Sequence, residues 1–236
     1  MKKIILLITA ISTLGFSVPL AQAAASDASV ATRRTAVQTK GDTDIQARLT
    51  SLNALITKVN AAEKLSAAQK STMTTEMQGE VTSLTALKTK LDAETELAAA
   101  RTDFQNIFAQ HYIYAFYLPR VERIIAADAE VQAAATLTTL AATLQIYITQ
   151  AKTAGNDVTD LQAKLDDMKT KTAAATTIAQ AALTALLPLT ASGYPGNKAT
   201  VQAAATSLKT GRTDLEAART DARAIVVSLK KTLNLK

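Results

Sequence analysis

Apolar residues alternate at spacings of four and three along most of this chain. One run is Ile45, Leu49, Leu52, Ile56 and Val59, and a longer run extends from Val201 to Leu233. Because this spacing places side chains on one face of an α-helix, it predicts amphipathic helices that each bury one side. Only 7 Gly and 4 Pro occur among the 236 residues, which excludes a turn-rich β fold.

Capping and helix-breaking residues divide this pattern into separate helices. Ser66 and Gln69 have the form of a capping box that opens a helix at position 67. Pro119 should start a new helix or kink a long one, and Gly155 fits a helix C-terminus. Residues 190–197 are predicted to form the one substantial loop.

The predicted fold is all-α, an elongated antiparallel bundle of about six helices. Its last helix, residues 198–233, could continue through Gly211 or break there. Small residues are expected to fill the contacts between the helices of the bundle, because 48 Ala and 35 Thr make up about a third of the chain. Alanine permits close helix approach but buries less apolar area than leucine, so long helices must compensate.

The N-terminus has the three parts of a secretory signal peptide. Lys2 and Lys3 precede an apolar stretch, and the small-x-small sequence Ala21-Gln22-Ala23 follows it. We expect residues 1–23 to be removed, the alternative being an uncleaved anchor. No later run reaches about 18 apolar residues, so no membrane span is expected after cleavage. The predicted location is the periplasm, the cell surface or the exterior.

Residues 24–42 lack periodicity and are predicted to be a flexible leader to a helical bundle at 43–236. Loss of Lys2 and Lys3 lowers the formal net charge from +6 to +4, and acids and bases are interspersed in the remainder. Nucleic-acid-binding proteins cluster their bases on one face, so no nucleic-acid partner is expected.

Two pairs of segments match at nearly one offset. Residues 43–49 match 159–165 at an offset of 116, and residues 95–103 match 213–221 at an offset of 118. Most charged positions match as well, which favours a duplicated unit of about 117 residues. The alternative is that any two Ala/Thr-rich amphipathic helices resemble each other by composition.

The duplicated units would span residues 43–158 and 159–236. Within them, Arg101-Thr102-Asp103 and Arg219-Thr220-Asp221 occupy equivalent positions. We expect Arg101 and Arg219 to anchor helix crossings by pairing with acids of a neighbouring helix. The alternative is weak charge pairing on the surface of their own helices.

Six of the eight aromatic residues beyond position 23 lie in one short segment, together with the only histidine, His111, and Pro119. The six are Phe104, Phe108, Tyr112, Tyr114, Phe116 and Tyr117. A helix that is apolar nearly all round is usually buried on several sides, which favours a central packing helix. The alternative is a ligand pocket or partner-docking surface with the tyrosine hydroxyls and His111 as its polar groups.

The sequence predicts no catalytic residue, no metal site and no cofactor. Cysteine is absent, which excludes a disulfide, a cysteine-ligated metal and a cysteine nucleophile. No serine lies in a G-x-S-x-G turn, no second histidine could act as a base, and no glycine-rich phosphate loop occurs. The adjacent acids Asp166 and Asp167 would point apart on a helix and are interpreted as solvated surface. An enzyme is therefore not expected.

Residues 84–120 contain the motifs Leu-Thr-Ala-Leu-Lys-x-Lys, Arg-Thr-Asp and Tyr-Ile-Tyr-Ala-Phe-Tyr-Leu-Pro, and Ala-Ala-Arg-Thr-Asp-Ala-Arg lies near the C-terminus. In these motifs the chain resembles a group of exported, Ala/Thr-rich helical-bundle bacterial proteins of uncharacterised activity. The resemblance covers half of the chain beyond position 23 and implies export and an all-α fold only.

Taken together, these features predict an exported, non-enzymatic structural or protein-interaction bundle of the cell envelope or exterior. The alternative is a small-ligand carrier that uses residues 104–117. A ligand-sized pocket lined by this segment would favour the carrier, and a filled core there would favour the structural protein. Apolar seams can also pair between chains, so the expected partner is another protein or a second copy.

Overall fold

The computed structural model describes residues 20–233 and the side chains from residue 27 onward. Its six α-helices are α1 (Leu20–Ala61), α2 (Ala67–Ala93), α3 (Leu97–Ala109), α4 (Leu118–Thr153), α5 (Thr159–Leu186) and α6 (Lys198–Thr232). A π-helical turn, η1 (Ile113–Tyr117), connects α3 to α4, and a 3-10 turn, η2 (Ala191–Gly193), lies between α5 and α6. The described residues therefore form a packed all-α bundle, as the periodicity predicts. The predicted signal peptide falls largely outside them.

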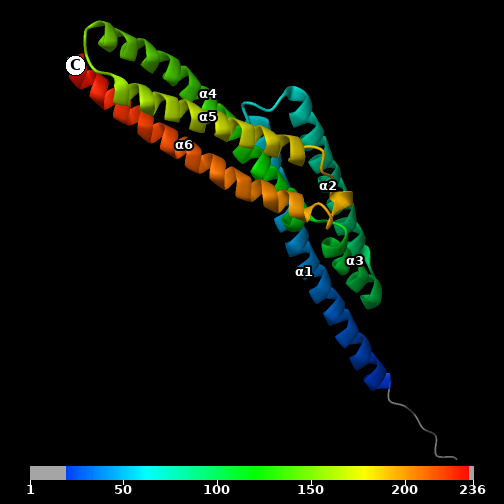
Figure 1. The fold of residues 1–236 in the computed structure, drawn as a ribbon. Coiled ribbons are helices and arrows are strands. Elements are labelled where there is room, and N and C mark those ends of the chain that lie inside the picture. The colour runs from blue at the N-terminus through cyan, green and yellow to red at the C-terminus, as the bar shows by residue number, and fades with distance from the viewer. Residues whose placement is uncertain (1–19, 234–236) are drawn as a thin grey trace, which may run out of the picture.

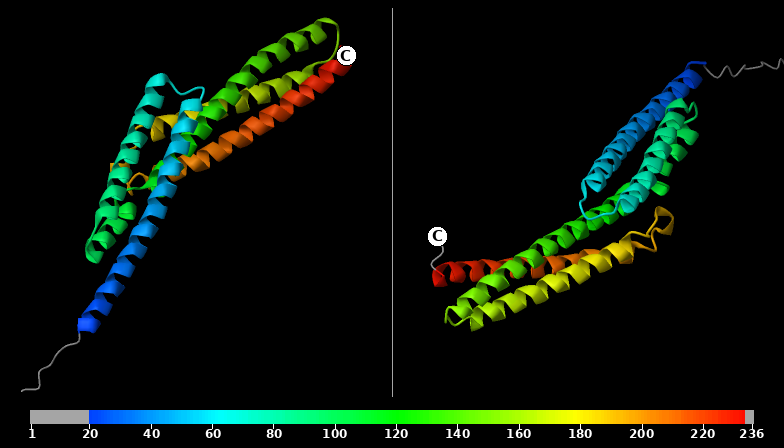
Figure 2. Two further views of the ribbon diagram at one scale, coloured as in Figure 1. Left: turned by 180° about the vertical axis from the view of Figure 1, so that it is seen from behind. Right: turned by 90° about the horizontal axis from the view of Figure 1, so that it is seen from above.

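The helices form two groups, which Figures 1 and 2 show from several sides. Helices α1, α2 and α3 pack together, while α4, α5 and α6 run side by side with α5 antiparallel to the other two. One hydrophobic cluster fills the first group and extends into the start of α4, the end of α5 and the start of α6. A second cluster lies farther along, between α4, α5 and α6. Helix α4 thus belongs to both cores.

The prediction of a flexible leader at 24–42 is wrong, because these residues belong to α1. The hydroxyls of Thr32 and Thr35 donate to carbonyls four residues earlier, at 2.9 and 3.1 Å. The Gln38 amide donates to Leu91 O at 2.9 Å, at the end of α2. Apolar periodicity is missing here because the N-terminal part of α1 extends beyond the bundle (Figure 1), and an exposed helix needs no apolar stripe.

The helix-end signals in the sequence are confirmed. Ser66 accepts from Gln69 N at 3.2 Å while the Gln69 side chain accepts from Ser66 N at 2.8 Å, which completes the capping box of α2. Gly155 adopts φ +85° just after α4, where a left-handed residue ends a helix at little steric cost. Pro119 lies in the first turn of α4, where its missing N–H leaves no helical bond unmade.

Helix α6 continues through Gly211, which settles the alternative that the sequence left open. A Cβ at this position would lie 2.8 Å from Glu130 Oε2 on α4 and 3.3 Å from Ile178 Cγ2 on α5. Gly211 therefore permits close approach of three helices rather than a break in one of them.

The matched sequence segments occupy different places in the helices. Residues 43–49 lie inside α1, whereas their match at 159–165 begins α5. Residues 95–103 span the break before α3, whereas their match at 213–221 lies inside α6. Because helix boundaries differ between the two halves, the duplication stays a prediction.

Candidate functional site

The aromatic segment does not form the continuous helix that its spacing suggests. Helix α3 ends at Ala109, and in η1 the amides of Phe116 and Tyr117 both donate to Tyr112 O, at 2.8 and 3.2 Å. Pro119 provides the physical reason. In a regular helix its ring would clash with the carbonyl one turn earlier, which favours a wider turn ahead of it. This turn changes the direction in which successive rings point, so the rings do not follow the spacing of one regular helix.

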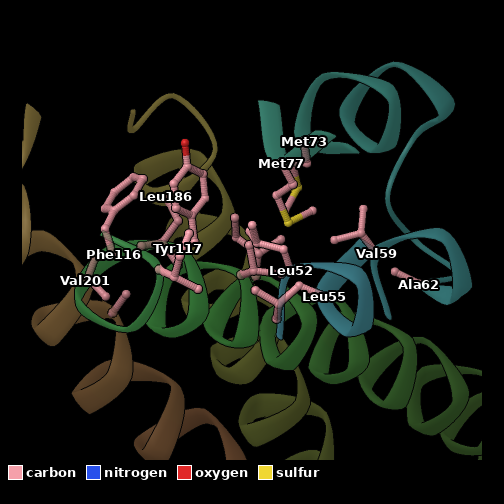
Figure 3. Packing of buried hydrophobic residues seen from close by; sticks show 14 of the residues in the cluster. Leu52, Leu55, Val59, Ala62, Met73, Met77, Phe116, Tyr117, Leu186 and Val201 are labelled. Atoms are coloured by element: carbon pink, nitrogen blue, oxygen red, sulfur yellow. The ribbon is translucent and has the colours of Figure 1, made fainter. Parts of the chain in front are cut away.

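Phe116 and Tyr117 point into the first hydrophobic core. Figure 3 shows them beside Leu186 of α5 and Val201 of α6. Their rings meet edge to face with centroids 5.3 Å apart, and both side chains are buried. Burial, together with the negative charges of Glu80 and Glu76, raises the pKa of the Tyr117 phenol. This part of the segment is therefore filled core.

Arg120 is the most deeply placed charge in the segment, with 2 % of its surface exposed. Its Nη1 donates to Glu76 Oε2 of α2 at 2.8 Å. Its Nε and Nη2 donate to the carbonyls of Leu186 and Leu187, at 3.0 and 2.8 Å, where α5 ends. One guanidinium therefore joins α2, α4 and the C-terminus of α5, whose partial negative charge favours a cation.

His111 makes a second link to α2. Its Nδ1 lies 2.7 Å from Glu80 Oε1, and the imidazole is buried. Because Glu76 and Glu80 are four residues apart, they lie on one face of α2 and meet Arg120 and His111 along it. The sequence analysis does not single out these two acids, although their spacing of four residues indicates that they share one face of a helix.

The exposed part of the segment surrounds an arginine of α1. Phe108 and Tyr114 are exposed, and the Arg48 guanidinium lies 4.6 and 5.2 Å from their ring centroids. Arg48 is itself buried and donates through Nη1 to Asp44 O at 2.9 Å. Phe104 packs edge to face on Phe108, with centroids 5.4 Å apart. Cation–π contacts of this kind fasten α1 to the aromatic segment.

Tyr112 takes a third direction, toward the loop between α5 and α6. Its ring lies on that of Tyr194, with centroids 4.7 Å apart. The predicted docking residues thus lie in three places: in the hydrophobic core, around Arg48, and against the loop between α5 and α6. The structure does not bring them together in one pocket, although Tyr114 borders an open groove of about 710 Å³ along α1.

The predicted anchoring role of Arg101 and Arg219 is corrected by the structure. Both are exposed, and neither forms an ion pair within residues 27–233. The aspartate of each motif makes the contact between helices instead: Asp103 accepts from Lys90 Nζ at 2.7 Å, and Asp221 lies 3.4 Å from Lys171 Nζ. The reason is geometric, because the buried face of α3 runs through Asp103, and an arginine two residues earlier points away from it.

Two buried acids of α4 were also missed. Asp128 accepts from the backbone amides of Glu63 and Lys64, at 3.1 and 2.8 Å, and so holds the loop between α1 and α2. Glu130 is buried beside Gly211, and neither carboxylate oxygen has a hydrogen-bond partner among the described residues. Burial raises the pKa of Glu130, and Arg212 at 4.0 Å opposes the shift.

The charged and aromatic groups of this region thus act on neighbouring helices. They fasten α1, α2 and α5 to the segment between α3 and α4, and in the described part of the chain no group of three His, Asp or Glu side chains could hold a metal ion. Comparison with protein-family models, with curated proteins and with solved structures finds no match to this chain.

Proposed function

We propose that this chain is an exported, non-enzymatic structural or interaction bundle of the cell envelope or exterior. The export part of the proposal rests on the signal-peptide sequence of residues 1–23, and the structural part rests on how the aromatic segment uses its polar groups. His111 pairs with Glu80, Arg120 joins α2 to the end of α5, and the ring of Tyr117 is buried. Because these groups hold neighbouring helices together, they are not free to bind a ligand. A partner would therefore bind to the outer faces of the helices.

The finer fold prediction supports the same role. We infer an elongated antiparallel arrangement derived from a duplicated unit of about 117 residues. The two sequence matches carry the inference, and the equivalent aspartates Asp103 and Asp221 each pair with a lysine of the preceding helix, although Lys90 and Lys171 are not themselves matched positions. Long duplicated bundles offer extended surfaces, which suits a spacer or a partner-binding protein.

Export is tested by the intact mass of the protein recovered from the cell envelope and the medium. The proposal expects the mass of a chain that begins at Ala24 or a neighbouring alanine. Full-length protein confined to the cytoplasm would contradict it.

The binding role is tested by comparing the protein purified from its producing cells with a surface variant, Phe108→Ala/Tyr114→Ala. Native mass spectrometry should find no small ligand on the wild-type chain. The chain itself should appear as a monomer, as a dimer or in a complex with another protein. A co-purifying small molecule that the variant loses would instead favour the carrier. Phe116→Ala serves as the matched core variant, because it should lower stability without changing which molecules co-purify.

A further inference from the structure

The distal half of α4 is unusually free of charge. Residues 131–151 contain no Asp, Glu, Lys or Arg, and at 1.5 Å per residue they extend about 30 Å. The stretch Leu97–Thr153, which comprises α3, η1 and α4, contains an 18-residue window of mean hydropathy 1.2 that is long and apolar enough to cross a membrane by length and composition alone. Only 28 % of that window is buried. Helix α4 therefore presents much of an apolar stretch to its surroundings, with Ile146 and Tyr147 59 % and 39 % exposed.

The threonines of this stretch make its surface less polar than its composition implies. Five of them donate their hydroxyl to the carbonyl four residues earlier, at 2.8 to 3.3 Å: Thr136, Thr138, Thr139, Thr143 and Thr149. A hydroxyl whose proton is already bonded loses less on leaving water. These side chains can therefore meet a weakly polar medium through their methyl groups.

Beside the uncharged stretch, α4 and α6 form an apolar groove of about 440 Å³. Its apolar lining comes from Leu137, Leu140, Ala222, Val226 and Val227, and Val227 is 68 % exposed. Arg219 and Arg223 also line it. Apolar side chains are thus exposed next to cations.

The cations continue along one side of α6. Arg212, Arg219, Arg223 and Lys230 follow spacings of seven, four and seven, which place them on one helix face. The last three are exposed and form no ion pair within residues 27–233. Glu216 lies within one turn of Arg212 and Arg219 and offsets part of this charge. Arg219 and Arg223 of this row line the same groove as Val226 and the exposed Val227.

We propose that residues 131–151 of α4 and 219–230 of α6, the α4–α6 face, dock on an anionic phospholipid membrane surface. Interfacial helices combine apolar side chains and aromatic rings at the acyl boundary with bases at the headgroups. The α4–α6 face has Leu137, Leu140, Val226 and Val227 for the first and Arg219 and Arg223 for the second. An acidic peptide fits less well, because the uncharged stretch offers it few free hydrogen-bonding groups over a long surface. This inference goes beyond the proposed function, since it does not depend on the aromatic segment or on export.

Vesicle flotation tests the proposal with the full chain as it is purified from its producing cells. One vesicle contains equal parts phosphatidylcholine and phosphatidylglycerol, and the other contains phosphatidylcholine alone. Each base near an anionic surface contributes about 1 kcal/mol, so Arg219→Gln/Arg223→Gln should weaken binding about 10- to 30-fold. The matched control is Arg33→Gln/Arg101→Gln, which removes the same charge from exposed arginines of α1 and α3 and should change binding less than about 2-fold.

Preferential binding to the anionic vesicles, weakened by the first variant and retained by the control, supports the proposal. Val227→Asn should add a further loss, because it removes an apolar contact without changing charge. Equal loss in both arginine variants would overturn the proposal, since binding would then follow net charge. Binding that no variant changes would place the contact elsewhere, including residues 1–23. Binding to an acidic amphipathic peptide but not to vesicles would assign the face to a protein partner.

Discussion

Replacement of Arg120 by methionine should destabilise the protein more than almost any other single change. The substitution keeps an unbranched apolar stem but removes three hydrogen bonds of 2.8 to 3.0 Å, to Glu76 Oε2 and to the carbonyls of Leu186 and Leu187. Breaking a buried ion pair by removing one partner costs about 3–5 kcal/mol. Because Glu76 is 23 % exposed and water can reach it, we expect the lower end, about 3 kcal/mol.

Urea unfolding followed by circular dichroism measures this loss as a free energy of unfolding. For a chain of this size, about 3 kcal/mol corresponds to a fall of roughly 6–12 °C in melting temperature. The control is Arg101→Met, which replaces an exposed arginine and should change stability by less than about 0.5 kcal/mol.

A double variant separates the ion pair from the general loss of a large side chain. Arg120→Met/Glu76→Met removes both charges, and apolar replacement of a whole pair is often neutral or stabilising. It should therefore be more stable than Arg120→Met alone. A loss below about 1 kcal/mol for the single variant, or a double variant no more stable than it, would refute the reasoning.

Variants at three further residues test other buried and capping groups. Burial raises the pKa of Glu130, so the folded protein favours the protonated carboxyl. The stability of the fold is therefore fully present at low pH, and part of it is lost as the pH rises through the folded-state pKa and the buried carboxyl ionises. Glu130→Gln should thus raise unfolding free energy at pH 7 by about 1–3 kcal/mol and change it little at pH 4, and equal effects at both pH values would contradict this. Asp128→Ala should cost about 2–3 kcal/mol in urea unfolding, and more than Asp128→Asn, because two loop amides lose a charged acceptor. Ser66→Ala should lower unfolding free energy by about 1 kcal/mol, and no change would indicate that the capping box of α2 is not formed in solution.

Local signals in the sequence predicted most of the helix boundaries. The capping box at Ser66, the proline at 119 and the glycine at 155 act within one helical turn, so their effects are visible without knowledge of the partner helices. The missed helix at 24–42 has the opposite cause. Apolar periodicity arises where one face of a helix is buried. The N-terminal part of α1 extends beyond the bundle (Figure 1), so it buries little surface and its sequence lacks the pattern.

The candidate site was less predictable, because its contacts join residues distant in the chain. The π-helical turn before Pro119 redirects the rings, and no spacing rule for an ordinary helix anticipates that change. Arg120 meets one acid of α2 and two carbonyls at the end of α5, more than 40 residues away on either side. A charge after proline in an apolar segment marks Arg120 as unusual, but its partners depend on how the helices pack.

Hydrogen exchange measured by mass spectrometry tests most directly whether the segment from η1 to the first turns of α4 holds the neighbouring helices together. Peptides that cover residues 113–124 should exchange among the slowest in the chain, with protection equal to the global free energy of unfolding, because Phe116, Tyr117 and Arg120 are released only when the helices separate. The exposed N-terminal part of α1 should exchange fast. Rapid exchange at 113–124 while α4, α5 and α6 remain protected would show a locally opening segment, and would contradict the packing role from which the proposed function follows.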